Sequence, residues 1–303
     1  MRSFLNNSDD FYTFQKPMKK QSPLIGAHVS AAGGLYKAIE RGEALGVNAI
    51  QIFGASPRQY QAKIPSDAEA KKFRDTLKAS AIKEVYLHAA YLVNLASPEA
   101  ETRKKSIKNL SAHFEIAHKI GARGLIYHVG SGKESPKKKA IQHVISGMKE
   151  VLKKAKGDSV LIMENAAGGG AKLGSTAEDM AALMRGMKKN KRIKICFDTA
   201  HAFEAGIIEE YIPKNIKVFF DKWETAVGLE AIVAFHVNDS KTAFNSKHDR
   251  HENLGEGYIG MRAFQNLAKE RRLHHATWLL EVPGFDGEGP DQRNVDLLKR
   301  CFE

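Results

Sequence analysis

The chain has 303 residues, 43% of them hydrophobic, and a formal net charge of +12 at neutral pH, which allows a substantial core and favours a polyanionic partner such as nucleic acid. No apolar run approaches the roughly 20 residues of a membrane span, which excludes a membrane protein. Only two cysteines are present, Cys196 and Cys301, so we expect free thiols and an intracellular location, cytoplasmic or at the nucleoid in a bacterium.

Residues 1–23 lack the apolar segment of a signal peptide. We expect them to form an amino-terminal extension that is either disordered or packed on the domain that follows. Dividing the length by about 150 residues per domain suggests two domains, but no Pro/Gly/Ser-rich linker or change of composition supports that split. Residues 24–303 are therefore predicted to form one domain.

Eight short apolar runs are predicted as strands, at residues 24–29, 49–53, 85–88, 124–129, 159–164, 193–198, 232–238 and 277–282. Most are continuous rather than alternating, which is typical of strands buried on both faces of a parallel sheet. Stretches with helical spacing lie between them, at residues 32–45, 66–79, 98–120, 136–154, 177–188, 221–228 and 261–269. Eight strand–helix units predict an α/β protein, a single (β/α)₈ barrel of the TIM type.

Potential metal ligands close seven of these runs, namely His28, His88, His128, Glu164, Asp198, His236 and Glu281. From His88 onward they are 34 to 45 residues apart, which is about one strand–helix unit. The carboxyl ends of barrel strands converge on one face, where the active site lies. The set combines imidazoles and carboxylates without thiolates, and such sets suit zinc, manganese or iron in hydrolytic enzymes.

Two local motifs add three candidates. His201 follows Asp198 by three residues, and Asp249 and His251 form a D-x-H pair in the 22-residue connection 239–260. An extended D-x-H places both side chains on one face, and connections of this length are usually functional. The candidates then exceed the needs of one metal, and two metals about 3.5–4 Å apart can clamp both oxygens of a phosphoryl transfer. With the basic charge, this favours phosphodiester hydrolysis.

The chain resembles the endonuclease IV family, which consists of zinc-dependent apurinic/apyrimidinic endonucleases of base-excision repair. The matching segments extend over nearly the whole chain, from residue 24 to beyond Glu281. The most specific is HVNDSKTAFNSKHDRHENLGEGYIG at 236–260. The others are IGAHVSAAGG at 25–34, YLVNLASP at 91–98, IYHVGS at 126–131, IMENAAGGG at 162–170 and CFDTAHAFEAG at 196–206.

The resemblance implies a barrel that holds three zinc ions, with Glu164 as a bridge between two of them. It assigns the remaining ligands in three groups: His88 and His128 to the first ion; Asp198, His236 and Glu281 to the second; His201, Asp249 and His251 to the third. Sequence alone leaves open whether manganese or iron replaces zinc at some positions.

The resemblance also implies the reaction. A hydroxide between two zinc ions attacks the phosphate 5′ to an abasic site in duplex DNA, and leaves a 3′-hydroxyl and a 5′-deoxyribose phosphate. Glu164 orients the nucleophile and Glu281 assists in accepting its proton. The resemblance also implies that the protein removes blocking groups from 3′ ends. It further implies that the protein is a monomer.

Substrate recognition by the family uses bent DNA with the abasic nucleotide flipped out. By resemblance, Arg58 and Tyr91 are expected to insert into the base stack, and Arg250 to face a phosphate. His28 is expected beside the ligands as an outer partner. The chain departs from the family pattern at Ala89–Ala90 and at Ala200, where polar or small residues and cysteine are common; neither position is a ligand.

Two alternative functions share features of this pattern. Sugar isomerases and epimerases on related barrels also place His, Asp and Glu at strand ends, but they typically need fewer metals and no strongly basic surface. A catalytically silent DNA-binding barrel would not require a complete ligand set. The nine candidate ligands and the charge of +12 favour the nuclease.

Overall fold

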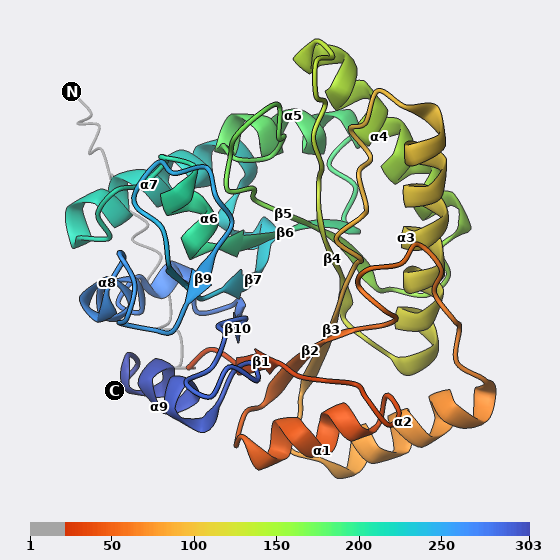
Figure 1. The fold of residues 1–303 in the computed structure, drawn as a ribbon, viewed down its shortest axis with the longest axis horizontal. Coiled ribbons are helices and arrows are strands. Elements are labelled where there is room, and N and C mark those ends of the chain that lie inside the picture. Colours follow the sequence, from red (N-terminus) through yellow and green to blue (C-terminus); the bar gives the residue numbers. More distant parts are fainter. Residues whose placement is uncertain (1–21) are drawn as a thin grey trace, which may run out of the picture.

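Eight parallel strands close into a barrel, and helices surround it (Figure 1). The computed structural model describes residues 22–303, so the predicted extension lies outside the described residues except for Ser22 and Pro23. Around the barrel the strands follow the order β1-β10-β7-β6-β5-β4-β3-β2. The predicted (β/α)₈ barrel is confirmed.

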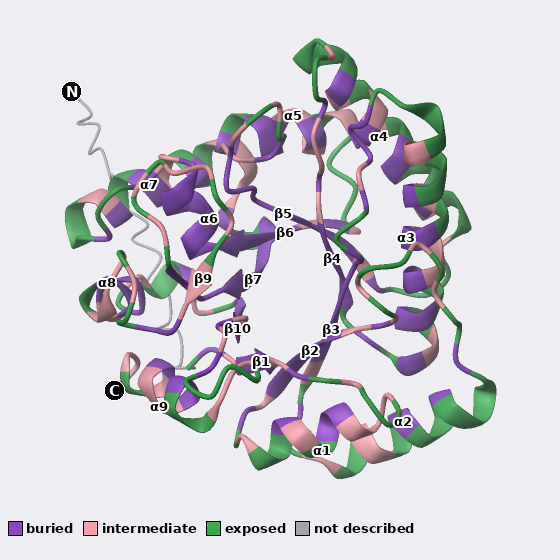
Figure 2. Ribbon diagram, in the orientation of Figure 1, coloured by how far each residue is buried: buried purple, intermediate pink, exposed green. Residues whose placement is uncertain are grey.

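All eight predicted strands are present, with ends that differ by at most two residues. They are β1 (Ile25–His28), β2 (Ala49–Phe53), β3 (Glu84–His88), β4 (Gly124–His128), β5 (Val160–Glu164), β6 (Ile193–Asp198), β7 (Ile232–His236) and β10 (Thr277–Leu280). Most of their residues are buried (Figure 2), because helices cover the outer face of the barrel and side chains fill its interior.

The strand register places the predicted ligands next to one another at one end of the barrel. His128 of β4 pairs with Glu164 of β5, and Asp198 of β6 pairs with His236 of β7. Below these polar ends, an apolar cluster with members from seven of the eight strands fills the interior. The barrel is therefore a closed scaffold whose polar side chains gather at the carboxyl ends of the strands.

Helices pack around the barrel within residues 22–303 (Figure 1). They are α1 (Lys37–Ala44), α2 (Asp67–Ala79), α3 (Ala100–Ile120), α4 (Lys137–Lys154), α5 (Ala177–Gly186), α7 (Pro213–Val227), α8 (Met261–Leu267) and α9 (Gln292–Arg300). Ser66 caps α2, since its side chain accepts from the Glu69 amide and the Glu69 side chain accepts from the Ser66 amide. Among residues 22–303, no helix combines the length and the apolarity needed to cross a membrane.

Several helix predictions were wrong at their ends. Helix α1 begins at Lys37 rather than at residue 32, because Gly33 and Gly34 have φ angles of +84° and +124°, outside the helical region. Helix α7 begins at Pro213 instead of residue 221, and proline is favourable in the first turn. Helix α9 and the short α6 (Thr199–Glu204) were not predicted.

The long connection 239–260 is folded over the barrel mouth. It contains a two-stranded antiparallel sheet of β8 (Asp239–Ser240) and β9 (His251–Glu252). The Asp239 carboxylate accepts hydrogen bonds from the amides of Gly255, Ile259 and Gly260 at 2.9–3.1 Å. A Cβ atom at Gly257 would lie 2.4 Å from the Ser240 carbonyl oxygen, so this tight return requires glycine there.

Candidate metal centre

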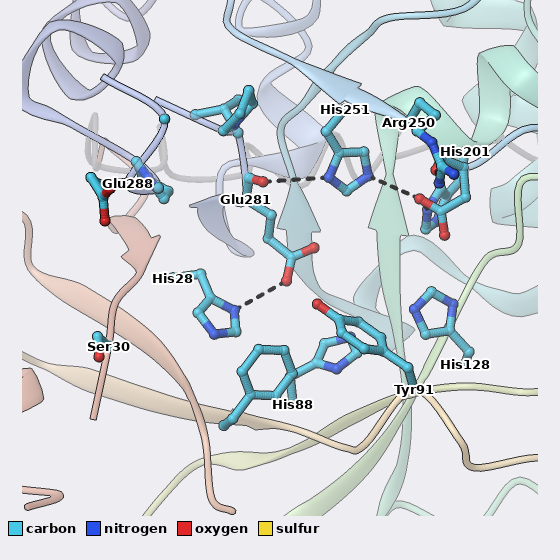
Figure 3. A pocket seen from close by; sticks show the side chains of 17 residues that line it. His28, Ser30, His88, Tyr91, His128, His201, Arg250, His251, Glu281 and Glu288 are labelled. Carbon is cyan, nitrogen blue, oxygen red and sulfur yellow. Dashed lines mark hydrogen bonds and ion pairs between the residues drawn. The ribbon is translucent and has the colours of Figure 1, made fainter. Parts of the chain in front are cut away.

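The barrel mouth forms a cavity of about 840 Å³ that collects imidazoles and carboxylates from distant parts of the chain (Figure 3). Six of the nine predicted ligands line it: His88, His128, His201, Asp249, His251 and Glu281. The other three, Glu164, Asp198 and His236, are fully buried and contact the lining residues. All nine predicted ligands therefore lie in one cluster.

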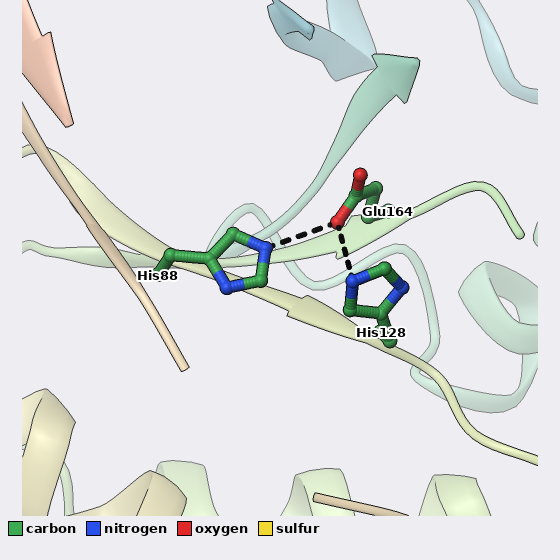
Figure 4. Close-up of side chains that lie close together, drawn as sticks. All are labelled: His88, His128 and Glu164. Carbon is green, nitrogen blue, oxygen red and sulfur yellow. Dashed lines mark hydrogen bonds and ion pairs between the residues drawn. The ribbon is translucent and has the colours of Figure 1, made fainter. Parts of the chain in front are cut away.

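The first group joins β3, β4 and β5. Glu164 Oε2 lies 3.1 Å from His88 Nε2 and 3.4 Å from His128 Nε2 (Figure 4). The other ring nitrogen of His88, Nδ1, donates to the Ala89 carbonyl oxygen at 2.9 Å. Because a carbonyl only accepts, this bond places a proton on Nδ1, so in the neutral imidazole Nε2 carries the lone pair that a metal ligand requires.

The second group lies on the other side of the same carboxylate. His236 Nδ1 is 2.9 Å from Glu164 Oε1, 3.0 Å from Glu281 Oε2 and 3.8 Å from Asp198 Oδ2. Its Nε2 donates to the Gln51 side-chain oxygen at 2.8 Å, so in the neutral imidazole Nδ1 carries the lone pair that could bind a metal. Glu164 thus presents Oε2 to the first group and Oε1 to the second, an arrangement suited to a bridging carboxylate.

The third group consists of His201 on α6 and the D-x-H pair. Asp249 Oδ1 lies 3.1 Å from His201 Nε2 and 3.7 Å from His251 Nε2. Both nitrogens are buried and lack a well-aligned hydrogen bond within residues 22–303. His201 Nδ1 donates to the Asn165 carbonyl oxygen at 2.8 Å. Buried imidazole nitrogens without such partners are unusual, and the residues of this group fit a metal ion.

Burial and neighbouring charges shift the pKa of several groups in the cluster. Burial disfavours the charged form of Glu164, but the imidazoles of His128 and His236 outweigh burial and hold the pKa of Glu164 well below its usual range. Burial likewise opposes protonation of His201 and His236, yet the surrounding carboxylates raise the pKa of both imidazoles well above the usual value. In the metal-free protein, protonated imidazoles balance the negative charge of the carboxylates. In the metal-loaded protein, bound cations would take over that role.

These shifts predict opposite pH trends for the metal-free and the metal-loaded protein. In the metal-free protein, the raised pKa values of His201 and His236 exceed the ordinary value of 6.5. Their contribution to the free energy of unfolding is therefore complete below about pH 6.5 and is lost as the pH rises through the raised values. The Tm of the chelated protein should therefore fall as the pH rises above about 6.5. The increase in Tm on adding zinc should become larger over the same range, because metal ligands must be deprotonated to bind zinc.

Differential scanning calorimetry across this pH range, with chelator and with zinc, measures both trends. The variant His201→Asn removes one of the two imidazoles and should flatten the decline of the chelated protein. A Tm of the chelated wild type that rises above about pH 6.5 would contradict the raised pKa values.

Three buried amides that sequence reasoning missed hold the ligands in place. Asn238 donates to Asp198 Oδ2 at 2.7 Å and accepts from the Glu281 amide at 2.8 Å. Gln51 contacts His236 and Glu281, and the Asn165 side chain bonds the backbone of Asp198. Asn165 and Asn238 follow the ends of β5 and β7, whereas Gln51 lies in the middle of β2. Such outer partners orient ligands and tune metal affinity.

The remaining predicted site residues lie around the mouth. His28 Nδ1 is 3.3 Å from Glu281 Oε1, beside the ligand cluster as expected. Tyr91 is 62% exposed and packs edge-on against Phe53, with ring centroids 5.4 Å apart. Arg250 is exposed and lines the mouth cavity. Arg58 is exposed too, but it does not line that cavity.

Basic side chains surround two smaller cavities next to the mouth. One of about 450 Å³ is lined by Lys133 and Lys172 together with Tyr91. The other, of about 510 Å³, is lined by Lys172, Lys247 and Arg250. The rim of the ligand cluster is therefore positively charged, which favours an anionic ligand.

Comparisons with known proteins agree with this geometry. A family described as xylose isomerase-like TIM barrel matches residues 39–301. The probable endonuclease 4 of Trichlorobacter lovleyi is 34% identical over 279 residues, 92% of this chain and 99% of that protein. Endonuclease IV from Thermus thermophilus has a TM-score of 0.81 and 32% identity over 92% of this chain and 98% of its own. A D-tagatose 3-epimerase-like protein, at 18% identity and a TM-score of 0.65 over 92% of this chain and 96% of its own, shares the fold alone. Because identity above 30% extends over nearly the full length of its relatives, this chain belongs to the endonuclease IV family.

Proposed function

We propose that this protein is a DNA-repair endonuclease that hydrolyses the phosphodiester 5′ to abasic sites in duplex DNA and also clears blocked 3′ ends. The proposal rests on membership of the endonuclease IV family and on one observation above all. Glu164 presents its two oxygens to two separate groups of ligand residues, with a third group beside them. That arrangement suits phosphodiester hydrolysis with two or more metal ions.

The nine clustered residues would hold three ions, for which zinc is our first choice. His88 and His128 would serve the first position with Glu164. The second position would use Glu164 with Asp198, His236 and Glu281. The third would use His201, Asp249 and His251. Bound ions of this kind polarise phosphate oxygens and lower the pKa of water, so that it deprotonates near neutral pH.

Protein groups would orient the attacking water and receive its proton. Glu164 is fully buried and held between imidazoles, so its carboxylate has a fixed direction. Glu281 is fixed by Gln51 and by His28. The pKa of Glu281 is low in the metal-free cluster, where burial is outweighed first by the charge on His236. A bound ion would take over that role from the charged imidazole, and Glu281 would stay ionised beside the attacking water, as a proton acceptor must.

Duplex DNA fits the surface around the cluster. The basic residues Lys172, Lys247 and Arg250 lie at the rim, where they would contact phosphates. Tyr91 lines the mouth and Arg58 is exposed, and both would fill the stack when the abasic nucleotide leaves it. We further propose that residues 24–303 act as one domain and that the enzyme is a monomer.

Removal of the Tyr91 ring should weaken recognition without affecting the metals. Stacking of an aromatic ring on a base contributes about 1–3 kcal/mol, so Tyr91→Ala is expected to lower affinity for abasic duplex by about 10-fold. Tyr91→Phe keeps the ring and should bind like the wild type. Fluorescence anisotropy with labelled abasic duplex measures both variants, and equal affinity of Tyr91→Ala and wild type would remove Tyr91 from the proposed interface.

One preparation tests the proposal against the sugar-isomerase alternative. The metal-loaded protein is incubated with duplex DNA containing one abasic site and, separately, with a series of ketoses. We expect incision of the DNA and no conversion of the sugars. Conversion of a ketose without incision would overturn the proposed function, since the barrel is shared with epimerases.

A further inference from the structure

Glu204 is an acidic residue inside the barrel mouth for which the nine predicted ligands leave no role. It is the last residue of α6, three residues after His201, and it is fully buried. A buried carboxylate is costly unless hydrogen bonds or a cation compensate for its charge. The partners of its two oxygens therefore decide what it does.

The two oxygens of Glu204 have different surroundings. Oε1 accepts from Ser240 Oγ at 2.9 Å and from the Arg250 amide at 3.1 Å, with Thr242 Oγ1 at 3.3 Å. These bonds tie α6 to the loop that carries Asp249. Oε2 is buried and has no hydrogen-bond partner within residues 22–303. Half of the carboxylate is therefore available to something that the protein itself does not supply.

Glu204 lies beside the third group of ligand residues. Glu204, His201 and Asp249 each offer a ligand atom within 4.8 Å of the other two. Atoms that share one ion at bond lengths of about 2.0–2.3 Å lie within such separations. Burial raises the pKa of Glu204 to about 7, against the opposing effects of the Ser240 hydrogen bond and the charge on His201.

We propose that Glu204 is a fourth protein ligand at the metal position formed by His201, Asp249 and His251. This inference rests on the metal centre of the proposed function and extends it. The set then contains two imidazoles and two carboxylates, with more negative charge and harder donors than the three-residue set. Such a set binds a divalent ion more tightly and is better suited to manganese.

A purely structural Glu204 would act through Oε1 alone, and two variants separate the possibilities. Glu204→Gln keeps the shape and an acceptor oxygen but removes the charge. Ser240→Ala removes a bond to Oε1 and leaves the Glu204 carboxylate in place. If Glu204 is a ligand, only Glu204→Gln weakens metal binding; if it only positions the loop, both variants affect metal binding alike or neither does.

The experiment measures metal binding without DNA. Zinc-loaded wild type, Glu204→Gln and Ser240→Ala are titrated with a chelator, and retained zinc is counted by elemental analysis. Glu204→Gln should release one of three ions at a chelator concentration at least about 10-fold lower than the wild type requires. Loss of a residue that only hydrogen-bonds to a metal ligand already lowers metal affinity by about 10- to 100-fold, so loss of a direct ligand should reach at least the lower limit. Ser240→Ala should release its ions like the wild type. Anomalous scattering from crystals of zinc-loaded wild type should place a Glu204 oxygen about 2.0–2.2 Å from the third ion.

Either measurement can overturn the inference. Equal retention by Glu204→Gln and wild type, or a third ion held without contact to Glu204, removes the proposed ligand and leaves the proposed function intact. Failure of the wild type to bind any ion at this position overturns the inference together with the three-metal proposal. If Glu204→Gln does not fold, the crystals of the wild type decide.

Discussion

Replacement of Glu164 with glutamine is expected to lower kcat/KM for incision of abasic DNA by at least about 10³-fold. Outer partners of metal ligands typically contribute about 10- to 100-fold, and a carboxylate shared by two ligand groups should exceed that range. Glutamine offers one weak oxygen donor where Glu164 offers two charged oxygens. The variant should also lose zinc from both neighbouring positions, which elemental analysis after dialysis measures.

Glu84 provides the matched control at the opposite end of the same barrel. Its Oε2 accepts from the Tyr86 and Thr277 hydroxyls, each at 2.6 Å. Glu84→Gln makes the same chemical change away from the ligand cluster, so its zinc content and incision rate per folded molecule should match the wild type. Full zinc content and near-normal incision by Glu164→Gln would contradict the bridging role.

Replacement of Asp249 with asparagine is expected to release one ion and to lower kcat by about 10²–10³-fold, the usual cost of removing one group that stabilises developing charge. Asp249 contacts both imidazoles of the third group, and these imidazoles strongly favour its charged form. The ions held around Glu164 should stay. Single-turnover incision of abasic duplex gives the rate, and elemental analysis gives the number of ions.

Glu256→Gln makes the same change of charge in the same long loop. Glu256 is exposed and forms an ion pair with Arg293 at 3.5 Å, and it lies outside the three ligand groups. This control should retain all ions and full activity. Loss of all three ions from Asp249→Asn, rather than of one, would show that the third position is not separate from the other two.

The convergence of the strand ends was predictable because the same short runs carry two signals. Each run is apolar enough to be buried on both faces, and each ends in a side chain such as His88 or Glu164 with its own chemistry. Once the runs are strands of a closed barrel, their ends must meet. His201 and the pair Asp249 and His251 needed the motif spacing and the resemblance, because they follow the strands rather than end them.

Other features of the site left no readable signal in the sequence. The strands β8 and β9 have two residues each, too few for a periodic pattern, so the fold of the long loop was not predicted. Gln51 and Asn238 carry no charge, and only the structure identifies their partners. Glu204 ends a helix of six residues, where an acidic side chain would ordinarily be exposed. The start of α1 was missed because helical spacing extends through residues whose backbone cannot be helical.

The most direct test of the account is incision of a duplex that carries one tetrahydrofuran abasic analogue. This analogue cannot undergo β-elimination, so any incision must be hydrolytic. The protein is assayed as purified, after removal of metal by a chelator, and after zinc is returned. We predict incision 5′ to the analogue with a 3′-hydroxyl product, loss of incision on chelation and recovery with zinc. Absence of incision by protein that holds its full complement of metal would contradict the account.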